Sequence, residues 1–180
     1  MKLAELKLDV EIPDGVSTEI TPEGRITAKG KKGEVSKEFR AIGIQISKEG
    51  KSIVFSAKKA TKKEKRMLGT FHAHLKNMVH GVVEGHKYAM KICSGHFPMT
   101  VIVKGNELSV KNFLGEKVPR TMDILENVTV KVDGAIVTVE SPDIERAGTV
   151  AGRIELLTFI SRRDRRIFQD GIFITHKSGE

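Results

Sequence analysis

The stretch TKKEKRMLGTFHAHLKNMVHGVVEG, residues 61–85, is where the hydrophobic pattern of the chain changes from that of strands to that of a helix. Its apolar residues recur at helical spacing and would lie on one side of a helix. They are Met67, Leu68, Phe71, Leu75, Met78, Val79 and Val82. Thr61 and Glu64 have the spacing of a capping box, whose side chains satisfy free N–H groups at a helix start. The stretch therefore predicts an amphipathic helix that begins after Thr61.

On both sides of this stretch, many apolar residues alternate with polar ones, which is typical of half-buried strands. Leu6, Leu8, Val10 and Ile12 alternate in this way before a turn at 13–15. Further short runs of this kind follow, and Gly or Pro separates most of them. Most of the chain outside the helical stretch therefore reads as short strands.

A second helical pattern follows residue 141. Ser141 is expected to be its N-cap, and Pro142 fits its first turn because a proline there loses no hydrogen bond within the helix. The chain closes with a predicted strand at 167–175. Strands followed by a helix therefore occur twice.

Short matches between the two halves support a duplication. Residues 26–29 (ITAK), for example, align with residues 108–111 (LSVK). The matches keep their order at a spacing of roughly 80–85 residues, which suits a duplicated small domain better than a solenoid repeat. We expect an α+β fold of two tandem duplicated domains, residues 1–84 and 85–180, each a mainly antiparallel sheet packed with one α-helix.

Composition narrows the class of protein. The 180 residues carry 31 Lys and Arg against 23 Asp and Glu, a net charge of +8, which favours an anionic partner such as nucleic acid or a membrane surface. No apolar run is long enough to span a bilayer, and the alternating N-terminus is unlike a secretory signal, so a cytoplasmic protein is expected. Aromatic residues make up only 5%, which disfavours a base-stacking platform.

The motifs of common enzyme classes are missing. The sequence contains no phosphate-binding P-loop, no dinucleotide-binding glycine motif and no nucleophile elbow. His72 and His74 are two positions apart, so on a helix their rings point roughly 200° apart and cannot chelate one ion. The single cysteine, Cys93, excludes a disulfide framework and a cysteine-rich zinc site. We expect no catalytic residue, no cofactor and no metal site.

Three clusters of basic side chains are candidate phosphate-binding sites. Arginine can grip phosphate with two hydrogen bonds, so the run RRDRR favours nucleic acid over a plain solvated loop. A second cluster surrounds a predicted glycine turn, and a third shares one helical face, where a solvated surface fits equally well. The clusters are, in this order, Arg162, Arg163, Arg165 and Arg166; Lys111, Lys117 and Arg120; and Lys59, Lys62, Lys63 and Arg66.

Net charge and clustering favour different halves of the chain. Residues 1–85 hold 17 basic and 11 acidic side chains, a net charge of +6, whereas residues 86–180 hold 14 and 12, a net charge of +2. Net charge therefore favours the first half as the anion binder, and the grouping of arginines favours the second. These two arguments leave the main binding surface open.

Three segments in order carry a resemblance to a known family. Residues 12–16 (IPDGV) with 26–34, residues 75–85, and residues 163–177 (RDRRIFQDGIFITHK) resemble segments of the universal large-subunit ribosomal protein six family. The runs CSGHFP and NFLGE resemble its archaeal and eukaryotic-type branch. Leu156 stands where many members have Gln, and Phe173 where many have Tyr.

The resemblance implies two α+β domains and a non-catalytic protein that binds large-subunit rRNA. Members sit beside the sarcin–ricin loop and the stalk base, near docking translational GTPases and among neighbouring large-subunit ribosomal proteins. We expect rRNA contacts from the arginine run and Lys177, then from Lys111, Lys117 and Arg120, with the helical basic face as a secondary surface. Asp170 and Gly171 are expected to shape a turn.

Two rival functions remain open at this stage. The chain could be a protein–protein scaffold whose charges serve only solubility, which salt-sensitive RNA binding would contradict. It could also be a small RNA-modifying enzyme, which needs a cofactor pocket and a poised acid, base or nucleophile.

Overall fold

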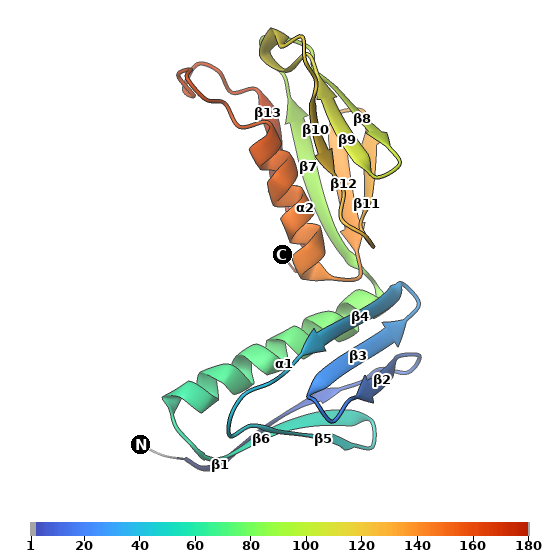
Figure 1. Cartoon of the computed structure of the whole chain (residues 1–180), viewed down its shortest axis with the longest axis vertical. Coiled ribbons are helices and arrows are strands. Elements are labelled where there is room, and N and C mark those ends of the chain that lie inside the picture. Colours follow the sequence, from blue (N-terminus) through green and yellow to red (C-terminus); the bar gives the residue numbers. More distant parts are fainter. Residues whose placement is uncertain (1–2, 180) are drawn as a thin grey trace. The chain divides into compact units, whose positions relative to one another are not determined.

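The computed structural model of the chain describes residues 3–179, apart from the side chains of Leu3, Ala4 and Lys59. The chain divides into two compact units between Gly85 and His86. Within the described residues, each unit contains two antiparallel sheets and a long helix (Figure 1). The expected α+β class and the repeated order of strands and helix are confirmed.

The first unit joins its strands into two sheets. Its strands are β1 (Leu3–Glu11), β2 (Ser17–Ile20), β3 (Arg25–Gly30), β4 (Gly33–Glu38), β5 (Gln45–Glu49) and β6 (Ser52–Ala60). One sheet has the order β1-β6-β5 and the other β2-β3-β4. Helix α1 (Lys62–Val83) packs against β6, β1 and β3, so it covers the apolar side of both sheets.

The second unit repeats this topology and adds a strand. Its elements are β7 (His86–Cys93), β8 (Thr100–Lys104), β9 (Glu107–Lys111), β10 (Arg120–Asp123), β11 (Thr129–Asp133), β12 (Ile136–Ser141), α2 (Ile144–Leu157) and β13 (Gly171–His176). The sheet orders are β11-β12-β7-β13 and β10-β9-β8. Strand β7 thus takes the place of β1. Strand β13 pairs with the outer edge of β7, whereas the corresponding edge of β1 has no partner strand in the described part of the first unit.

Each unit buries its own apolar core. In the first, the rings of Phe39, Phe55 and Phe71 meet with centroids 5.4 to 5.9 Å apart. The apolar face predicted for the first helix is confirmed, because all its members are buried except Met67, which is half-buried. In the second unit, α2 buries Ala147, Val150, Ala151 and Ile154. Both helices are therefore held by tertiary burial of one face.

The predicted start of the first helix is confirmed, and that of the second is wrong. Thr61 accepts a hydrogen bond from the Lys63 N–H, and the Glu64 carboxylate accepts one from the Thr61 N–H at 2.8 Å. The N-cap of α2 is Asp143, whose carboxylate accepts from the Glu145 N–H at 2.9 Å. Ser141 instead ends β12, because its buried hydroxyl donates to the carbonyl of Asn127.

Two predicted strands are shorter in the structure. The last strand, expected at 167–175, begins only at Gly171, because the preceding residues form a loop. The sequence also predicts a strand at 117–122, which in the structure begins only at Arg120, after a short 3-10 turn, Phe113–Gly115, and an irregular segment. Of the candidate basic residues, Lys117 therefore lies on a loop, whereas Arg120 is the first residue of β10.

Candidate nucleic-acid interface

The connection from α2 back to β13, residues 161–170, forms an exposed loop that we call the arginine loop (Figure 1). Its four arginines, at positions 162, 163, 165 and 166, are all exposed. The guanidinium carbon of Arg163 lies 4.9 Å from the ring centre of Phe168, and that of Arg165 lies 4.8 Å from the ring centre of Phe159. Stacking on a ring fixes the direction of a guanidinium group while its N–H groups stay free to bind phosphate.

Arg166 is tied to a neighbour within the same loop. Its side chain donates to the Asp164 carboxylate at 2.8 Å, and its backbone N–H donates there at 2.9 Å. The side-chain hydrogen bond, together with the backbone one, holds the pKa of Asp164 below its ordinary value. The Arg166 side chain remains 90% exposed. Asp164 therefore shapes the loop and offsets part of its positive charge.

The arginine loop is anchored to the turn after β7 by the buried carboxylate of Asp170. Its Oδ1 accepts hydrogen bonds from the N–H groups of Gly95 and His96, at 2.5 and 3.0 Å, and its Oδ2 lies 2.6 Å from Nδ1 of the His96 ring. Burial alone would raise the pKa of Asp170, but the hydrogen bonds from His96 and Gly95 outweigh it and hold that pKa below its ordinary value. The His96 ring also packs on Phe168, with centroids 4.5 Å apart. The expectation that Asp170 shapes a turn agrees with this anchor.

A second exposed loop, residues 112–119, lies at the same end of this unit (Figure 1). Lys111 and Lys117 are exposed at its two ends. The Asn112 side chain donates to the carbonyl of Pro98 at 2.9 Å, and the ring of Phe97 lies against Gly115. This loop therefore packs on the same turn that anchors the arginine loop, and the two sets of cations share one end of the unit.

Arg120, which was expected to contact rRNA, makes several contacts within the protein. Its guanidinium donates to both carboxylate oxygens of Glu116, at 2.8 and 2.6 Å, and to the carbonyls of Leu157 and Phe159, at 2.7 and 3.2 Å. It also lies 4.3 Å from the ring centre of Phe113. The group is therefore occupied by protein partners on the 112–119 loop and at the C-terminal end of α2, and it joins these two segments.

Lys177 lies away from the arginine loop. It is exposed and follows β13, whose six residues separate it from that loop. At about 3.3 Å a residue, the separation is roughly 20 Å. Near it, the ring of His86 contacts the Ser178 hydroxyl at 2.7 Å, at the opposite end of β7 from the arginine loop. The fold therefore separates Lys177 from the residues with which the sequence grouped it.

The helical basic face belongs to the other unit. Lys62, Lys63 and Arg66 are exposed in the first turns of α1, whereas the side chain of Lys59, on β6, lies outside the described part of the structure. Cations at a helix N-terminus oppose the macrodipole, and Glu64 in the same turn offsets them. These cations therefore do not stabilise the helix.

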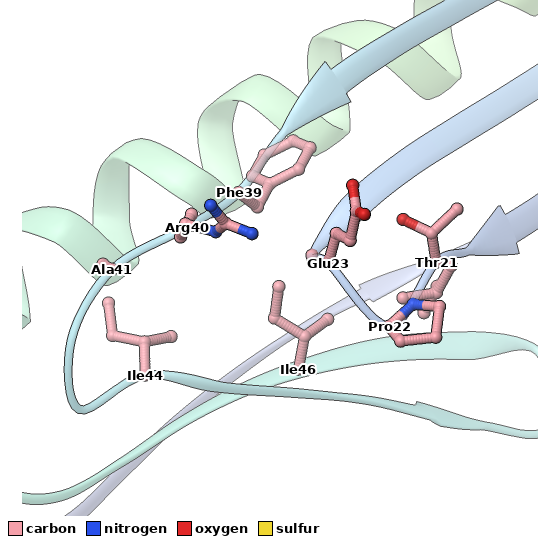
Figure 2. Close-up of a pocket in the computed structure, with 10 residues that line it drawn as sticks. Thr21, Pro22, Glu23, Phe39, Arg40, Ala41, Ile44 and Ile46 are labelled. Atoms are coloured by element: carbon pink, nitrogen blue, oxygen red, sulfur yellow. The ribbon is translucent and has the colours of Figure 1, made fainter.

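A hollow of about 490 Å³ lies in the first unit between the β2–β3 turn and the segment leading from β4 into β5 (Figure 2). Thr21, Pro22 and Glu23 line one side, and Phe39 and Arg40 line the other. Its lining includes one cation, Arg40, and one carboxylate, Glu23, so the hollow favours neither an anionic nor a cationic ligand. Sequence patterns gave no sign of this hollow, because its walls come from separate turns.

Sequence reasoning also missed an apolar surface beside the arginine loop. Leu156, Phe159 and Phe173 are exposed there and line a common pocket that Arg165 borders. The sequence signal for this surface is Leu156, an apolar residue that lies outside the apolar face of α2. Between residues 3 and 179, no set of three His, Cys, Asp or Glu side chains is arranged to hold a metal ion. None of the helices in that range has the length and apolar character to cross a bilayer.

Comparisons with known proteins match nearly the whole chain. The family model of ribosomal protein L6 matches twice, at residues 12–85 and 97–171, once in each unit. The large ribosomal subunit protein uL6 of Haloarcula marismortui is 41% identical over 171 residues, 95% of this chain and 96% of that protein. That of Methanosarcina mazei is 44% identical over 174 residues, 97% of this chain and 98% of that protein. That of Sulfurisphaera tokodaii is 43% identical over 179 residues, 98% of this chain and 95% of that protein. The second match includes the arginine loop.

Proposed function

The chain belongs to the ribosomal protein L6 family, and from this membership we propose that it is a structural protein of the large ribosomal subunit that binds large-subunit rRNA. It works in the cytoplasm, among neighbouring ribosomal proteins, and catalyses no reaction itself. The observation that carries the proposal is the match of the family over both units, joined with an exposed arginine loop in the second.

The finer placement rests on the resemblance given by the sequence motifs. We propose that the protein lies beside the sarcin–ricin loop and the stalk base, near the surface where translational GTPases dock. The chain then contributes no GTPase chemistry. It holds RNA helices in place at the factor-binding region.

Phosphate neutralisation supplies the affinity in this proposal. Lysine and arginine side chains that contact phosphates release bound counterions, so binding weakens as salt rises. The stacked guanidinium groups of Arg163 and Arg165 and the anchor at Asp170 fix the loop before RNA arrives. A preorganised loop loses less conformational entropy on binding.

The proposed contacts fall into a main surface and two separate ones. The main surface combines the arginine loop with Lys111 and Lys117, which share one end of the second unit. Lys177 is one secondary surface. The other comprises Lys62, Lys63 and Arg66 in the first turns of α1, together with Lys59 on the preceding strand β6. Arg120 supports the main surface from within the protein.

The test measures how the affinity of the full chain for purified large-subunit rRNA changes with salt. Replacing Arg163, Arg165 and Arg166 with Glu should weaken binding and flatten the slope of log affinity against log salt by about 2 to 3, at roughly 0.7–0.9 per lost phosphate contact. The control replaces Lys31, Lys76 and Lys104 with Glu, which makes the same change in charge at exposed sites outside the proposed surface.

Equal loss of affinity in the two triple variants would contradict the proposal, because overall charge would then explain the binding. An unchanged slope in the arginine variant would remove the arginine loop from the RNA contact. Circular dichroism of both variants checks that the fold is kept.

A further inference from the structure

An apolar pocket of about 720 Å³ opens beside the arginine loop in the second unit. Leu156 on α2, Phe159 just after it and Phe173 on β13 line the pocket and are 70%, 49% and 39% exposed. Large apolar side chains grouped on a surface mark binding sites more often than chance exposure does. The core beneath them is complete without them, since Ile154, Ile160 and Ile172 are buried there.

The aromatic walls of the pocket are held in place by local contacts. The ring of Phe173 lies against Gly171, where a Cβ would come within 2.9 Å of the ring. The guanidinium group of Arg165 covers the ring of Phe159 at 4.8 Å. Phe168 completes the wall and is packed against His96. A flat ligand would therefore meet preformed aromatic and aliphatic surfaces.

The arginine loop places cations along one side of the pocket. Arg165 borders the pocket, and Arg162 and Arg163 are exposed on the same loop. Two carboxylates, Glu155 and Asp170, also line the pocket, but each already accepts hydrogen bonds from the protein. Glu155 accepts from the Ile174 N–H at 3.4 Å, and Asp170 accepts from the turn after β7. An apolar floor with arginines along one side complements a nucleotide, whose base is flat and apolar on its faces and whose phosphate is anionic.

We propose that this pocket receives an unpaired base of the RNA that the arginine loop holds. Leu156, Phe159 and Phe173 contact the base, and Arg165 contacts a flanking phosphate. This inference rests on the proposed function and adds the kind of RNA element recognised, which is a bulged or looped-out nucleotide rather than continuous duplex. The low aromatic content of the chain argued against a stacking platform, but a single pocket needs only two or three well-placed rings.

The experiment compares three RNAs that differ at one position. They are a duplex with one bulged adenosine, the same duplex with an abasic residue at the bulge, and the fully paired duplex. The full chain should bind the bulged adenosine RNA about 5- to 150-fold more tightly than the abasic RNA, which is the contribution of stacking one base on an aromatic site. Fluorescence anisotropy at one fixed salt concentration measures the three dissociation constants.

Two variants test which side chains give this preference. L156S and F173S should each lower the preference for the bulged adenosine RNA and leave the affinity for the abasic RNA unchanged. Leu156 is the safer site for folding because it lies on the solvent side of α2. The matched control is I136S, since Ile136 is a 54% exposed apolar residue of the same unit outside the pocket. This control should keep the full preference.

Cys93 offers a readout that needs no substitution. It is the single cysteine of the chain and lines the pocket. The bulged adenosine RNA should slow alkylation of Cys93 by iodoacetamide, and the abasic RNA at equal occupancy should not. Equal protection by both RNAs would overturn the proposal, because the base would then be irrelevant to the pocket.

The outcomes separate this inference from the proposed function. Salt-dependent binding with equal affinity for all three RNAs would overturn the base pocket and leave the family function standing. L156S that leaves every affinity unchanged would also overturn the base pocket. Binding to large-subunit rRNA without binding to any of the three RNAs would overturn the base pocket alone, and failure to bind large-subunit rRNA as well would overturn both proposals.

Discussion

Asp170 shows how a single buried residue places the arginine loop. Its carboxylate joins the loop to the turn after β7 through the N–H groups of Gly95 and His96. A buried carboxylate is stable only when donors replace the water it has lost. The anchor therefore converts a short polar segment into a loop of fixed shape.

The substitution Asp170→Asn tests this anchor. We expect it to lower the free energy of unfolding of the second unit by about 1–3 kcal/mol at pH 7, because an amide is a weaker acceptor and loses the charge that faces His96. Since the folded-state pKa of Asp170 lies below the ordinary value of 3.8, its stabilisation is present above about pH 4 and is lost as the pH falls through the folded pKa. The gap between wild type and variant should therefore close in acid.

Tyr88 provides the measurement, because it is the single tyrosine, the chain has no tryptophan, and it lies on β7 of the second unit. Urea titrations followed by tyrosine fluorescence at pH 7 and below pH 4 give the two free energies. The control is Asp164→Asn, which removes a carboxylate from the exposed part of the same loop and should change stability little. A gap that widened in acid would show that the sign argued for Asp170 is wrong.

Arg120 shows that the position of a cation in the sequence does not reveal whether its side chain is free to bind phosphate. Its place beside Lys117 suggested a phosphate contact, but its guanidinium is committed to Glu116 and to the carbonyls of Leu157 and Phe159. The hydrogen bond from Arg120 also lowers the pKa of Glu116. A pattern of cations cannot tell which of them is used inside the protein, because the partners are distant in sequence.

At the scale of elements, α1 is specified by signals that lie within a few residues of one another. Thr61 and Glu64 close the capping box, and the apolar face of the helix is buried along its length. Replacing Thr61 with Ala should lower the free energy of unfolding of the first unit by about 0.5–2 kcal/mol, since N–H groups at the helix start lose their acceptor. The start of α2 was misplaced by two residues because Ser141 and Asp143 are both good caps.

Hydrogen exchange read by mass spectrometry measures the Thr61→Ala effect at the amides of residues 62–66. The matched control is Thr70→Ala, which removes an exposed threonine from the same helix, where its hydroxyl bonds only the carbonyl of Arg66. Faster exchange confined to the first turn in the Thr61 variant is expected. Equal effects of the two substitutions would argue against a role for the cap.

At the scale of the whole molecule, the two units bury separate cores. Leu75 is fully buried in the first and Ile154 in the second. Replacing Leu75 with Ala should lower the free energy of unfolding of the first unit by about 2–5 kcal/mol, because it leaves a cavity. We expect the transition reported by Tyr88 in the second unit to stay in place.

The matched variant for Leu75→Ala is Ile154→Ala, which should shift the Tyr88 transition to lower urea. Circular dichroism reports on both units, so each variant should shift part of its unfolding transition. The Tyr88 transition should stay in place in the Leu75 variant and move in the Ile154 variant. A Tyr88 transition that moves equally in both variants would mean that the chain unfolds as a single cooperative unit.

The two duplicated units differ in the features on which we base RNA recognition. The strand order of the first unit returns in the second, which then gains β13 and the arginine loop that leads into it. The first unit holds the larger net charge, but the second holds the grouped arginines and the apolar pocket. The surface on which we place RNA recognition is therefore built on what the second unit adds to the repeat.

The sequence by itself determined the class of fold, the repeat, the start of α1 and the exposed arginine run, because these depend on periodicity and on contacts between near neighbours. The tertiary structure alone decided which cations share a surface. It separated Lys177 from the arginine loop, turned Arg120 inward and joined Leu156, Phe159 and Phe173 into one pocket. The reason is physical: strand pairing and side-chain packing bring together residues far apart in the chain, and no local pattern encodes which ones will meet.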